Sequence, residues 1–181
     1  RHARGNIATA GVPVAVHRLG FGELFGALPG PYDAIACLGN STPHLLTEQT
    51  LASALADMGA ILRRGGLLII QTRNYDRVLA RQERFMSPEA HRQRGEEWAF
   101  FRFYHIEGAA LKFNMLRLHR RAGEQWSTSL QSTDLHAWQH VEMKAHLAQA
   151  SFTEVKAYGS FQGEPFDPLE SPDLVLTATR G

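Results

Sequence analysis

The sequence has little cysteine, no long apolar run and almost no net charge, and each of these deficits excludes a class of protein. Its single cysteine rules out a framework of internal disulfides and is typical of a reducing compartment, so we expect a cytoplasmic location. No apolar run approaches the roughly 18 residues that cross a membrane, which predicts a protein without a membrane partner. A net charge of +1 disfavours nucleic acid as a partner, because phosphate binding needs a clustered basic face.

Length and composition are typical of one folded domain. With 181 residues and 44% hydrophobic side chains, the chain can bury about 70% of the surface that it exposes when unfolded. The arginines between Arg77 and Arg94 are interspersed with acidic residues, which favours a solvated helix face over an RNA-binding groove. Cys37 lies inside a predicted strand, where a small buried hydrophobic residue is a better interpretation than a nucleophile.

A strand, a helix and a second strand follow one another between residues 34 and 70. Short apolar runs at 34–38 and 67–70 predict the two strands. Thr47 caps the helix between them, whose apolar residues recur at helical spacing: Leu51, Leu55, Met58 and Leu62. The predicted helix has Arg63 and Arg64 in its last turn and ends at a glycine in the left-handed conformation, either Gly65 or Gly66. The pattern is a βαβ unit with parallel strands.

Polar residues follow both of these strands. Gly39-Asn40-Ser41 comes directly after the first strand, and Arg73-Asn74-Tyr75 comes after the second. In an open α/β sheet the carboxyl ends of neighbouring parallel strands form the ligand crevice. We therefore expect both clusters to face the same cleft.

The motifs Leu38-Gly39-Asn40-Ser41, His44-Leu45 and Arg73-Asn74-Tyr75-Asp76 identify a family. Together they resemble class I S-adenosylmethionine-dependent methyltransferases, and most of all the glycine/sarcosine N-methyltransferase group. The resemblance implies an α/β fold with a Rossmann-like sheet, S-adenosyl-L-methionine as cofactor and a small-molecule acceptor such as glycine or sarcosine. It also implies that Leu38 to Ser41 lie along the cofactor, while Asn40 and Arg73 hold the amino acid.

The beginning of the chain departs from this family. A complete enzyme of the group starts with a strand, a glycine-rich loop and a second strand that ends in an acid, none of which is present. In the family, a helix follows that second strand, and residues 1–11 resemble the end of this helix. The N-terminal part of the fold is therefore expected to be missing. The segment from Val14 to Leu24 aligns with the third strand and the residues that follow it in the family. There the family often has Asp or Asn and then a hydrophobic residue that contacts the adenine. Gly20 stands at the polar position, and Phe21 can pack on the adenine. The alternative is a truncated or degenerate methyltransferase-fold protein that binds a ligand or partner without catalysis.

The same glycines permit a second interpretation. Gly20, Gly22 and Gly26 resemble the dinucleotide-binding fingerprint of nicotinamide enzymes. The third glycine comes one place too late, however, and residues 28–31 contain two prolines where the phosphate site needs the start of a helix. We therefore favour the methyltransferase.

The second half of the chain predicts a lid and the end of the sheet. Three antiparallel strands at 98–106, 111–120 and 126–135 form a lid inserted at about 96–135 in a single domain of residues 1–181. A helix at 141–150 and strands at 152–158 and 174–178 follow. In methyltransferases that resemble this chain, such a last pair of strands is an antiparallel hairpin that closes the sheet.

Arg73 is the strongest candidate for substrate recognition, because a guanidinium offers bidentate, charge-assisted hydrogen bonds to a carboxylate. A structural ion pair with Asp76 is the alternative. Tyr75 joins Asn40 and Arg73 as a predicted substrate-binding residue. Catalysis by alignment of a neutral amine with the sulfonium methyl needs no certain general base, and the candidates are Tyr75, His44 and Tyr104. For His44, packing at a helix start is an equally good interpretation.

The histidines suggest a metal site only weakly. His136 and His140 are four residues apart, as in zinc helices, but Ala137 replaces the expected glutamate and a third ligand is missing. We therefore predict no metal. An open sheet edge is expected where the first two strands of the family's fold would lie, which predicts either that the chain alone is unstable or that it pairs with a second copy.

Overall fold

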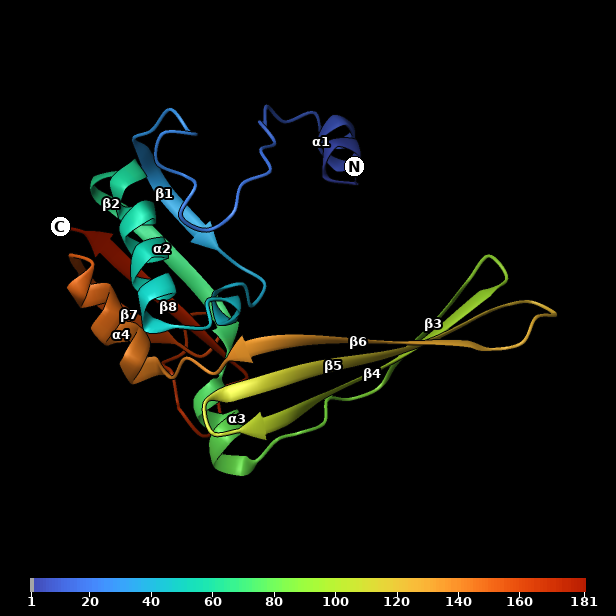
Figure 1. Ribbon diagram of the computed structural model, residues 1–181. Helices are drawn as coiled ribbons and strands as arrows, with labels where there is room; N and C mark the ends of the chain where they lie inside the picture. Colours follow the sequence, from blue (N-terminus) through green and yellow to red (C-terminus); the bar gives the residue numbers. More distant parts are fainter. Residues whose placement is uncertain (1) are drawn as a thin grey trace.

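The computed structural model describes residues 2–181 and contains two four-stranded sheets (Figure 1). The first sheet has the strand order β1 (Tyr32–Cys37), β2 (Leu62–Arg73), β8 (Asp173–Arg180) and β7 (Phe152–Tyr158). Strands β1 and β2 are parallel, whereas β8 is antiparallel to both β2 and β7. The predicted α/β class and the antiparallel hairpin at the end of the sheet are thus confirmed.

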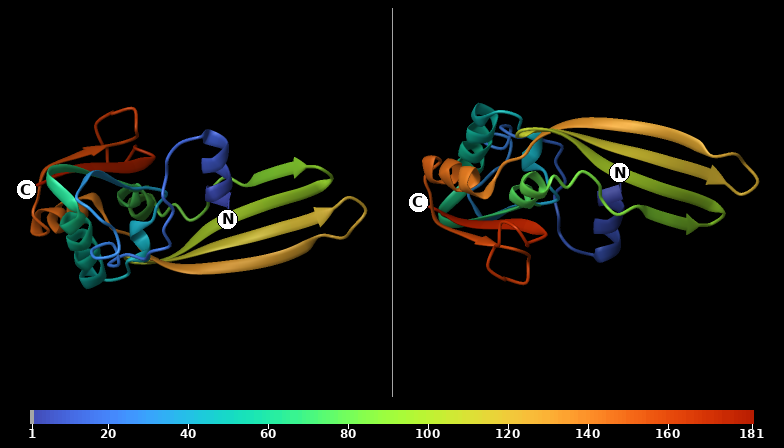
Figure 2. Two further views of the ribbon diagram at one scale, coloured as in Figure 1. Left: turned by 90° about the horizontal axis from the view of Figure 1, so that it is seen from above. Right: turned by 90° about the horizontal axis from the view of Figure 1, so that it is seen from below.

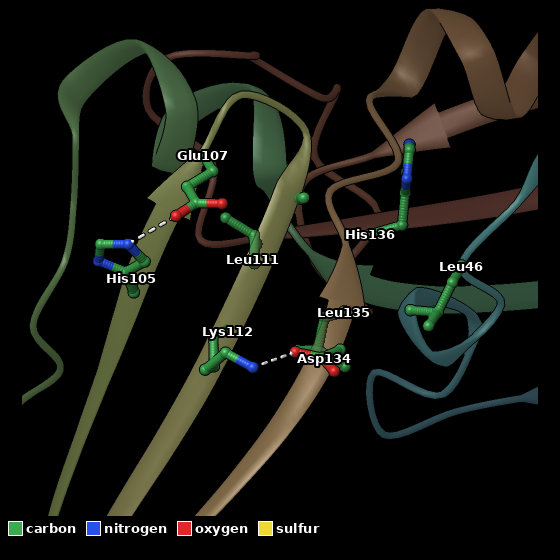
Figure 3. Close-up of a pocket in the computed structure, with 9 residues that line it drawn as sticks. Leu46, His105, Glu107, Leu111, Lys112, Asp134, Leu135 and His136 are labelled. Carbon is green, nitrogen blue, oxygen red and sulfur yellow. Dashed lines mark hydrogen bonds and ion pairs between the residues drawn. The ribbon is translucent and has the colours of Figure 1, made fainter.

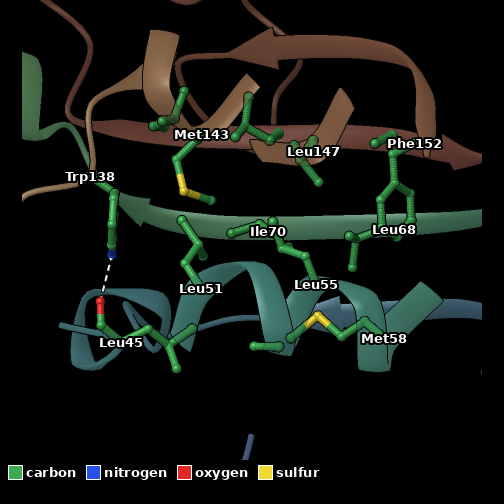
Figure 4. Packing of buried hydrophobic residues seen from close by; sticks show 14 of the residues in the cluster. Leu45, Leu51, Leu55, Met58, Leu68, Ile70, Trp138, Met143, Leu147 and Phe152 are labelled. Atoms are coloured by element: carbon green, nitrogen blue, oxygen red, sulfur yellow. Dashed lines mark hydrogen bonds between the residues drawn. The ribbon is translucent and has the colours of Figure 1, made fainter. Parts of the chain in front are cut away.

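Helices α2 (Glu48–Ile61) and α4 (His140–Gln149) cover one face of this sheet. Helix α2 begins as predicted, with a capping box between Thr47 and Thr50. Its apolar stripe packs against α4 and the sheet in one buried cluster (Figure 4), which includes Leu51, Leu55, Met58, Leu68, Ile70, Met143 and Leu147. Each such side chain contributes about 1.5–3 kcal/mol when fully buried, so this layer fixes how β1 and β2 lie side by side.

The end of α2 differs from the prediction. The helix stops at Ile61, and Arg63 and Arg64 lie in β2 rather than in a last helical turn. Leu62 already has extended backbone and pairs with Tyr32 of β1, so strand pairing begins immediately after the helix. Gly65, with φ of +72°, therefore lies where the register between β1 and β2 shifts and does not cap the helix.

The predicted strand from Val14 to Leu24 is wrong. Helix α1 (His2–Ala10) ends before it, and residues 12–20 are irregular with Val14 53% exposed. Within residues 2–181, β1 is an edge strand, and no backbone hydrogen bond joins residues 12–20 to its open edge. The segment is held instead by Asp57 of α2, which accepts hydrogen bonds from the amides of Leu24 (2.9 Å) and Phe25 (2.8 Å).

The lid is a sheet of four strands rather than the three predicted. It consists of β3 (Glu89–Gln93), β4 (Glu96–Glu107), β5 (Ala110–Arg121) and β6 (Ser127–His136), and it projects away from the first sheet (Figure 2). The arginine-rich stretch is not one long helix, because α3 (Tyr75–Arg81) ends at Gln82 in a left-handed conformation and β3 pairs with β4. In the described part of the chain, no helix is long and apolar enough to span a membrane.

Candidate functional site

The site begins where β1 ends. Gly39 and Asn40 both have positive φ, of 75° and 62°, a conformation that glycine adopts freely and asparagine tolerates. The Gly39 amide donates to the side-chain oxygen of Gln71 (2.8 Å), and the Asn40 amide donates to the Gln71 carbonyl (3.3 Å). These bonds fasten the turn to β2.

Asn40 connects the ends of both parallel strands. Its Oδ1 accepts a hydrogen bond from the backbone amide of Arg73 (3.0 Å), and its Nδ2 lies 2.9 Å from the Tyr75 hydroxyl. Tyr75 is fully buried. An amide group has two donors and two acceptor lone pairs, so one N–H of Asn40 has no partner among residues 2–181 while the rest of its side chain joins the two strands.

Arg73 does not form the structural ion pair that we considered as an alternative. Asp76 accepts hydrogen bonds from the amide and the Nδ1 of His140, at 2.9 and 2.8 Å, and thereby caps the start of α4. The Arg73 Nε is buried and has no hydrogen-bond partner among residues 2–181. A buried donor without a partner costs about 1–3 kcal/mol, so this Nε is a candidate for hydrogen bonding to a molecule in the site.

Asn74, in contrast, is structural. Its Nδ2 donates to the carbonyls of Asp167 (3.2 Å), Pro168 (3.1 Å) and Ser171 (2.9 Å), and its Oδ1 accepts from the amide of Arg77 (3.1 Å). One side chain therefore caps α3 and fixes the proline-rich loop before β8. Within the motif of residues 73–76, only Arg73 keeps an unpartnered buried polar atom in the described chain.

A cavity of about 370 Å³ lies between this corner and the lid. Its walls come from the strand ends (Gly39, Asn40 and Arg73), from His44 in the short 3-10 helix Thr42–His44, and from the lid side (Met86, Arg102, Tyr104, Phe113, Thr133 and Leu135). Tyr104, Phe113 and Thr133 are in register on β4, β5 and β6, so one row across the lid sheet faces the site. The Tyr104 ring meets the Tyr75 ring edge-on, with centroids 6.5 Å apart.

Both tyrosines are protonated at neutral pH. Burial raises the pKa of Tyr75 far above its usual value, and the neighbouring Tyr104 raises it further. Burial also raises the pKa of Tyr104, although the positive charge of Arg73 opposes the shift. At this site the two hydroxyls are neutral hydrogen-bonding groups rather than ready-made bases, which leaves the exposed His44 as the third candidate.

Comparison with known proteins identifies the fold. The chain has TM-scores of 0.76 and 0.77 with an S-adenosylmethionine-dependent methyltransferase from Clostridium acetobutylicum and with DesVI from Streptomyces venezuelae. Sequence identities are 12% and 16%, and the matches cover 99% of this chain and 70% and 69% of those chains. The chain has the class I methyltransferase fold.

Sequence similarity to this fold's glycine-methylating members is local. A segment of 50 residues is 50% identical to the glycine/sarcosine N-methyltransferase of Parasynechococcus marenigrum, covering 28% of this chain and 18% of that protein. A segment of the same length is 52% identical to the glycine/sarcosine/dimethylglycine N-methyltransferase of Actinopolyspora halophila, covering 28% and 9%. These matched segments thus span less than a fifth of the length of each relative. No family model matches the chain.

The structure places only some of the predicted site residues at the cavity. The cavity is lined by Gly39, Asn40, His44, Arg73 and Tyr104. Tyr75 does not line it but forms a hydrogen bond with the side chain of Asn40. Leu38 and Ser41 flank it, since Leu38 is 47% exposed and the Ser41 hydroxyl donates to the Leu38 carbonyl (2.8 Å). Gly20 and Phe21 do not line it. They belong to the irregular segment, where the Gly20 amide donates to the Glu23 carboxylate (2.6 Å).

Sequence reasoning missed Gln71, Arg102, Phe113 and Thr133. A signal for Arg102 was present, because residues two apart on a strand share a face and Tyr104 was already a candidate. The register of Phe113 and Thr133 depends on how the lid strands pair, which a single sequence does not specify.

A second hollow, of about 260 Å³, lies at the base of the lid and differs in chemistry (Figure 3). His105 pairs with Glu107 (2.9 Å) and Lys112 pairs with Asp134 (2.7 Å), all with side chains more than half exposed. The Asp134 carboxylate raises the pKa of Lys112. These ionisable side chains of the hollow thus pair with each other. The cavity at Arg73, in contrast, contains a buried donor without a partner in the described chain. We therefore place the candidate site at the Arg73 cavity.

Proposed function

We propose that this chain is part of an S-adenosylmethionine-dependent methyltransferase that methylates the amine of a small amino acid such as glycine or sarcosine. The observation that carries the proposal is the buried, unpartnered Nε of Arg73 in a cavity at the carboxyl ends of two parallel strands. A planar guanidinium at that position suits a carboxylate. The local similarity to glycine/sarcosine N-methyltransferases supports the same acceptor.

Residues at the end of β1 fit the cofactor. A Cβ added to Gly39 would meet no atom within 4 Å, so the backbone there is open to a ligand, and Leu38 offers an exposed apolar side chain beside it. We infer that Leu38, Gly39, Asn40 and Ser41 hold the methionine and adenosine parts, with Gly20 and Phe21 on the adenine side. When bound, S-adenosylmethionine supplies an electrophilic methyl group.

The chain's own residues then bind and orient the acceptor. Arg73 holds the carboxylate, and the free N–H of Asn40 donates a hydrogen bond to it. The neutral Tyr104 hydroxyl and His44 face the amine, and His44 is the better candidate to take its proton because both tyrosines keep theirs. Alignment of the amine supplies most of the rate enhancement, since the methyl group is already reactive.

The single cysteine supports a cytoplasmic setting for this activity. Burial raises the pKa of the Cys37 thiol to about 11, so it stays protonated and has no role as a nucleophile. We infer that Cys37 is a reduced structural residue that packs against the core cluster.

A protein of the same fold that binds a ligand without catalysis is the second candidate. It is favoured by the irregular, exposed segment 12–20, which leaves the adenine side of the site without a regular strand. Calorimetric titration of S-adenosylmethionine into the chain, with and without glycine or sarcosine, separates the two. Micromolar cofactor binding followed by methyl transfer supports the enzyme, and cofactor binding without transfer supports the alternative. Absence of cofactor binding contradicts the proposal for this chain.

A further inference from the structure

We propose that Arg102 of the lid is a second anion-binding residue of the cavity and binds an acidic group of the methyl acceptor. The proposal rests on the proposed function, because the ligand of this cavity is taken to be the acceptor. It adds the requirement that the lid, and not only the end of β2, selects for negative charge.

Arg102 and Arg73 approach the cavity from different sheets. Arg102 lies on β4, two residues before Tyr104 and therefore on the same face of the lid, and both residues line the cavity together with Arg73. Within residues 2–181, the Nε atoms of Arg73 and Arg102 are both buried and both lack a hydrogen-bond partner. Two guanidinium groups that line one cavity, each with a buried donor that lacks a partner in the described chain, indicate an anionic ligand.

The ion pair of Arg102 does not provide a hydrogen-bond acceptor for its Nε atom. Its Nη2 pairs with Glu89, whose side chain is 49% exposed at the rim of the lid. This contact involves Nη2, and the Nε atom is left without a hydrogen-bond partner in the described chain. Because Glu89 is half in water, its charge is partly screened and the guanidinium stays attractive to a second anion.

The rest of the cavity favours an anion as well. Its described lining residues include two arginines and a histidine but neither aspartate nor glutamate. Tyr104 lies in the field of both arginines, which each oppose the effect of burial on its pKa. An acceptor without a carboxylate would leave the buried Nε atoms of Arg73 and Arg102 without a partner among residues 2–181, whereas a carboxylate can accept hydrogen bonds from them, so the site favours acidic acceptors over uncharged ones.

The test measures anion binding and does not depend on methyl transfer. The nitrogen-15-labelled chain is titrated with glycine, with the uncharged-carboxyl analogue glycinamide and with iminodiacetate, an amine with two carboxylates. Arginine Nε–Hε signals are followed by NMR and assigned with Arg73→Gln and Arg102→Gln. We expect both signals to move with the carboxylates, and Arg102→Gln to weaken carboxylate binding at least about tenfold while glycinamide binding stays unchanged.

The matched control is Arg121→Gln. Arg121 is also on the lid and also paired with a glutamate, Glu96, but its side chain is exposed and does not line the cavity. It should leave all three affinities unchanged. Glu89→Gln tests Arg102 from its partner's side, because it removes the negative charge that competes with a ligand for the guanidinium, and it should strengthen carboxylate binding severalfold.

The outcomes separate clearly. If Arg102→Gln weakens glycine binding, Arg102 and Arg73 share one carboxylate, and if it weakens only iminodiacetate, Arg102 takes a second acidic group. Unchanged affinity for both carboxylates in Arg102→Gln overturns the proposal, as does a lack of carboxylate binding by the unmodified chain. Should Arg102→Gln fail to fold, unchanged affinity in Glu89→Gln overturns it. Anion binding that depends on Arg102 without any methyl transfer contradicts only the proposed function.

Discussion

The Nδ2 atom of Asn40 lies 2.9 Å from the hydroxyl of Tyr75, although the two residues are 35 positions apart in the sequence. This contact joins the turn after β1 to the start of α3, and the same Asn40 side chain accepts a hydrogen bond from the backbone amide of Arg73. Tyr75 is buried and held there by the second hydrophobic cluster, with Val78, Tyr104 and Leu111. The orientation of the candidate site therefore depends on a residue that does not line the cavity.

Replacing Tyr75 with phenylalanine tests this role. The variant removes the hydroxyl but keeps the ring, so Asn40 loses one partner in a half-buried place, and we expect a loss of about 1–3 kcal/mol in the free energy of unfolding. Denaturant unfolding measures it. The matched control is Tyr158→Phe on β7, where the hydroxyl has no hydrogen-bond partner in the described chain. Equal effects of the two variants would contradict the contact's importance.

Arg73→Ala tests carboxylate recognition. We expect the KM for the amino-acid acceptor to rise at least about tenfold, because a charge-assisted hydrogen bond is lost, while the cofactor Kd stays nearly unchanged. Steady-state kinetics and cofactor titration measure the two quantities separately. Arg64→Ala is the control, since Arg64 is also on β2 but exposed. An unchanged acceptor KM in Arg73→Ala rules out the proposed role.

The two buried tyrosines predict a loss of stability at high pH. Their pKa values are raised in the folded state above the unfolded value of about 10, so the folded protein holds these protons more tightly. The stabilisation is complete below pH 10 and is lost as the pH rises through the folded-state pKa values. Denaturation midpoints followed from pH 8 upward should fall above about pH 10. Tyr104→Phe should reduce this fall, and an identical pH profile in that variant would contradict the assignment.

The sequence predicted those parts of the fold whose signals are local. The apolar runs of β1 and β2 and the stripe of α2 are set by periodicity and by the Thr47 cap, and the structure has all of them. Helix α4 and strands β7 and β8 also occur within two residues or so of the predicted bounds. Burial of one face is enough to specify such elements.

The errors all depend on partners that lie elsewhere in the chain. Residues 14–24 have strand-like composition, but a strand also needs backbone hydrogen bonds to a neighbouring strand, and the described chain pairs this segment with none. Residues 89–93 are mostly polar and all exposed, so only their pairing with β4 makes them a strand. The role of Arg102 is likewise set by the lid's position over β2, which composition and spacing do not encode.

Asn74 supports the most direct test of which motif residues are structural. It is 1% exposed and serves both the cap of α3 and the loop before β8, so Asn74→Ala should cost about 2–4 kcal/mol of stability through the lost cap and the orphaned carbonyls. Asn74→Ser keeps an oxygen for the cap but cannot donate to the loop carbonyls. We expect it to recover about 1 kcal/mol and no more, and to leave the loop open to proteolysis between residues 163 and 172. Full recovery by serine would assign the stabilisation to the cap alone and leave the loop to be held by its own contacts, such as the Asp167 amide donating to the Ser171 hydroxyl (2.9 Å).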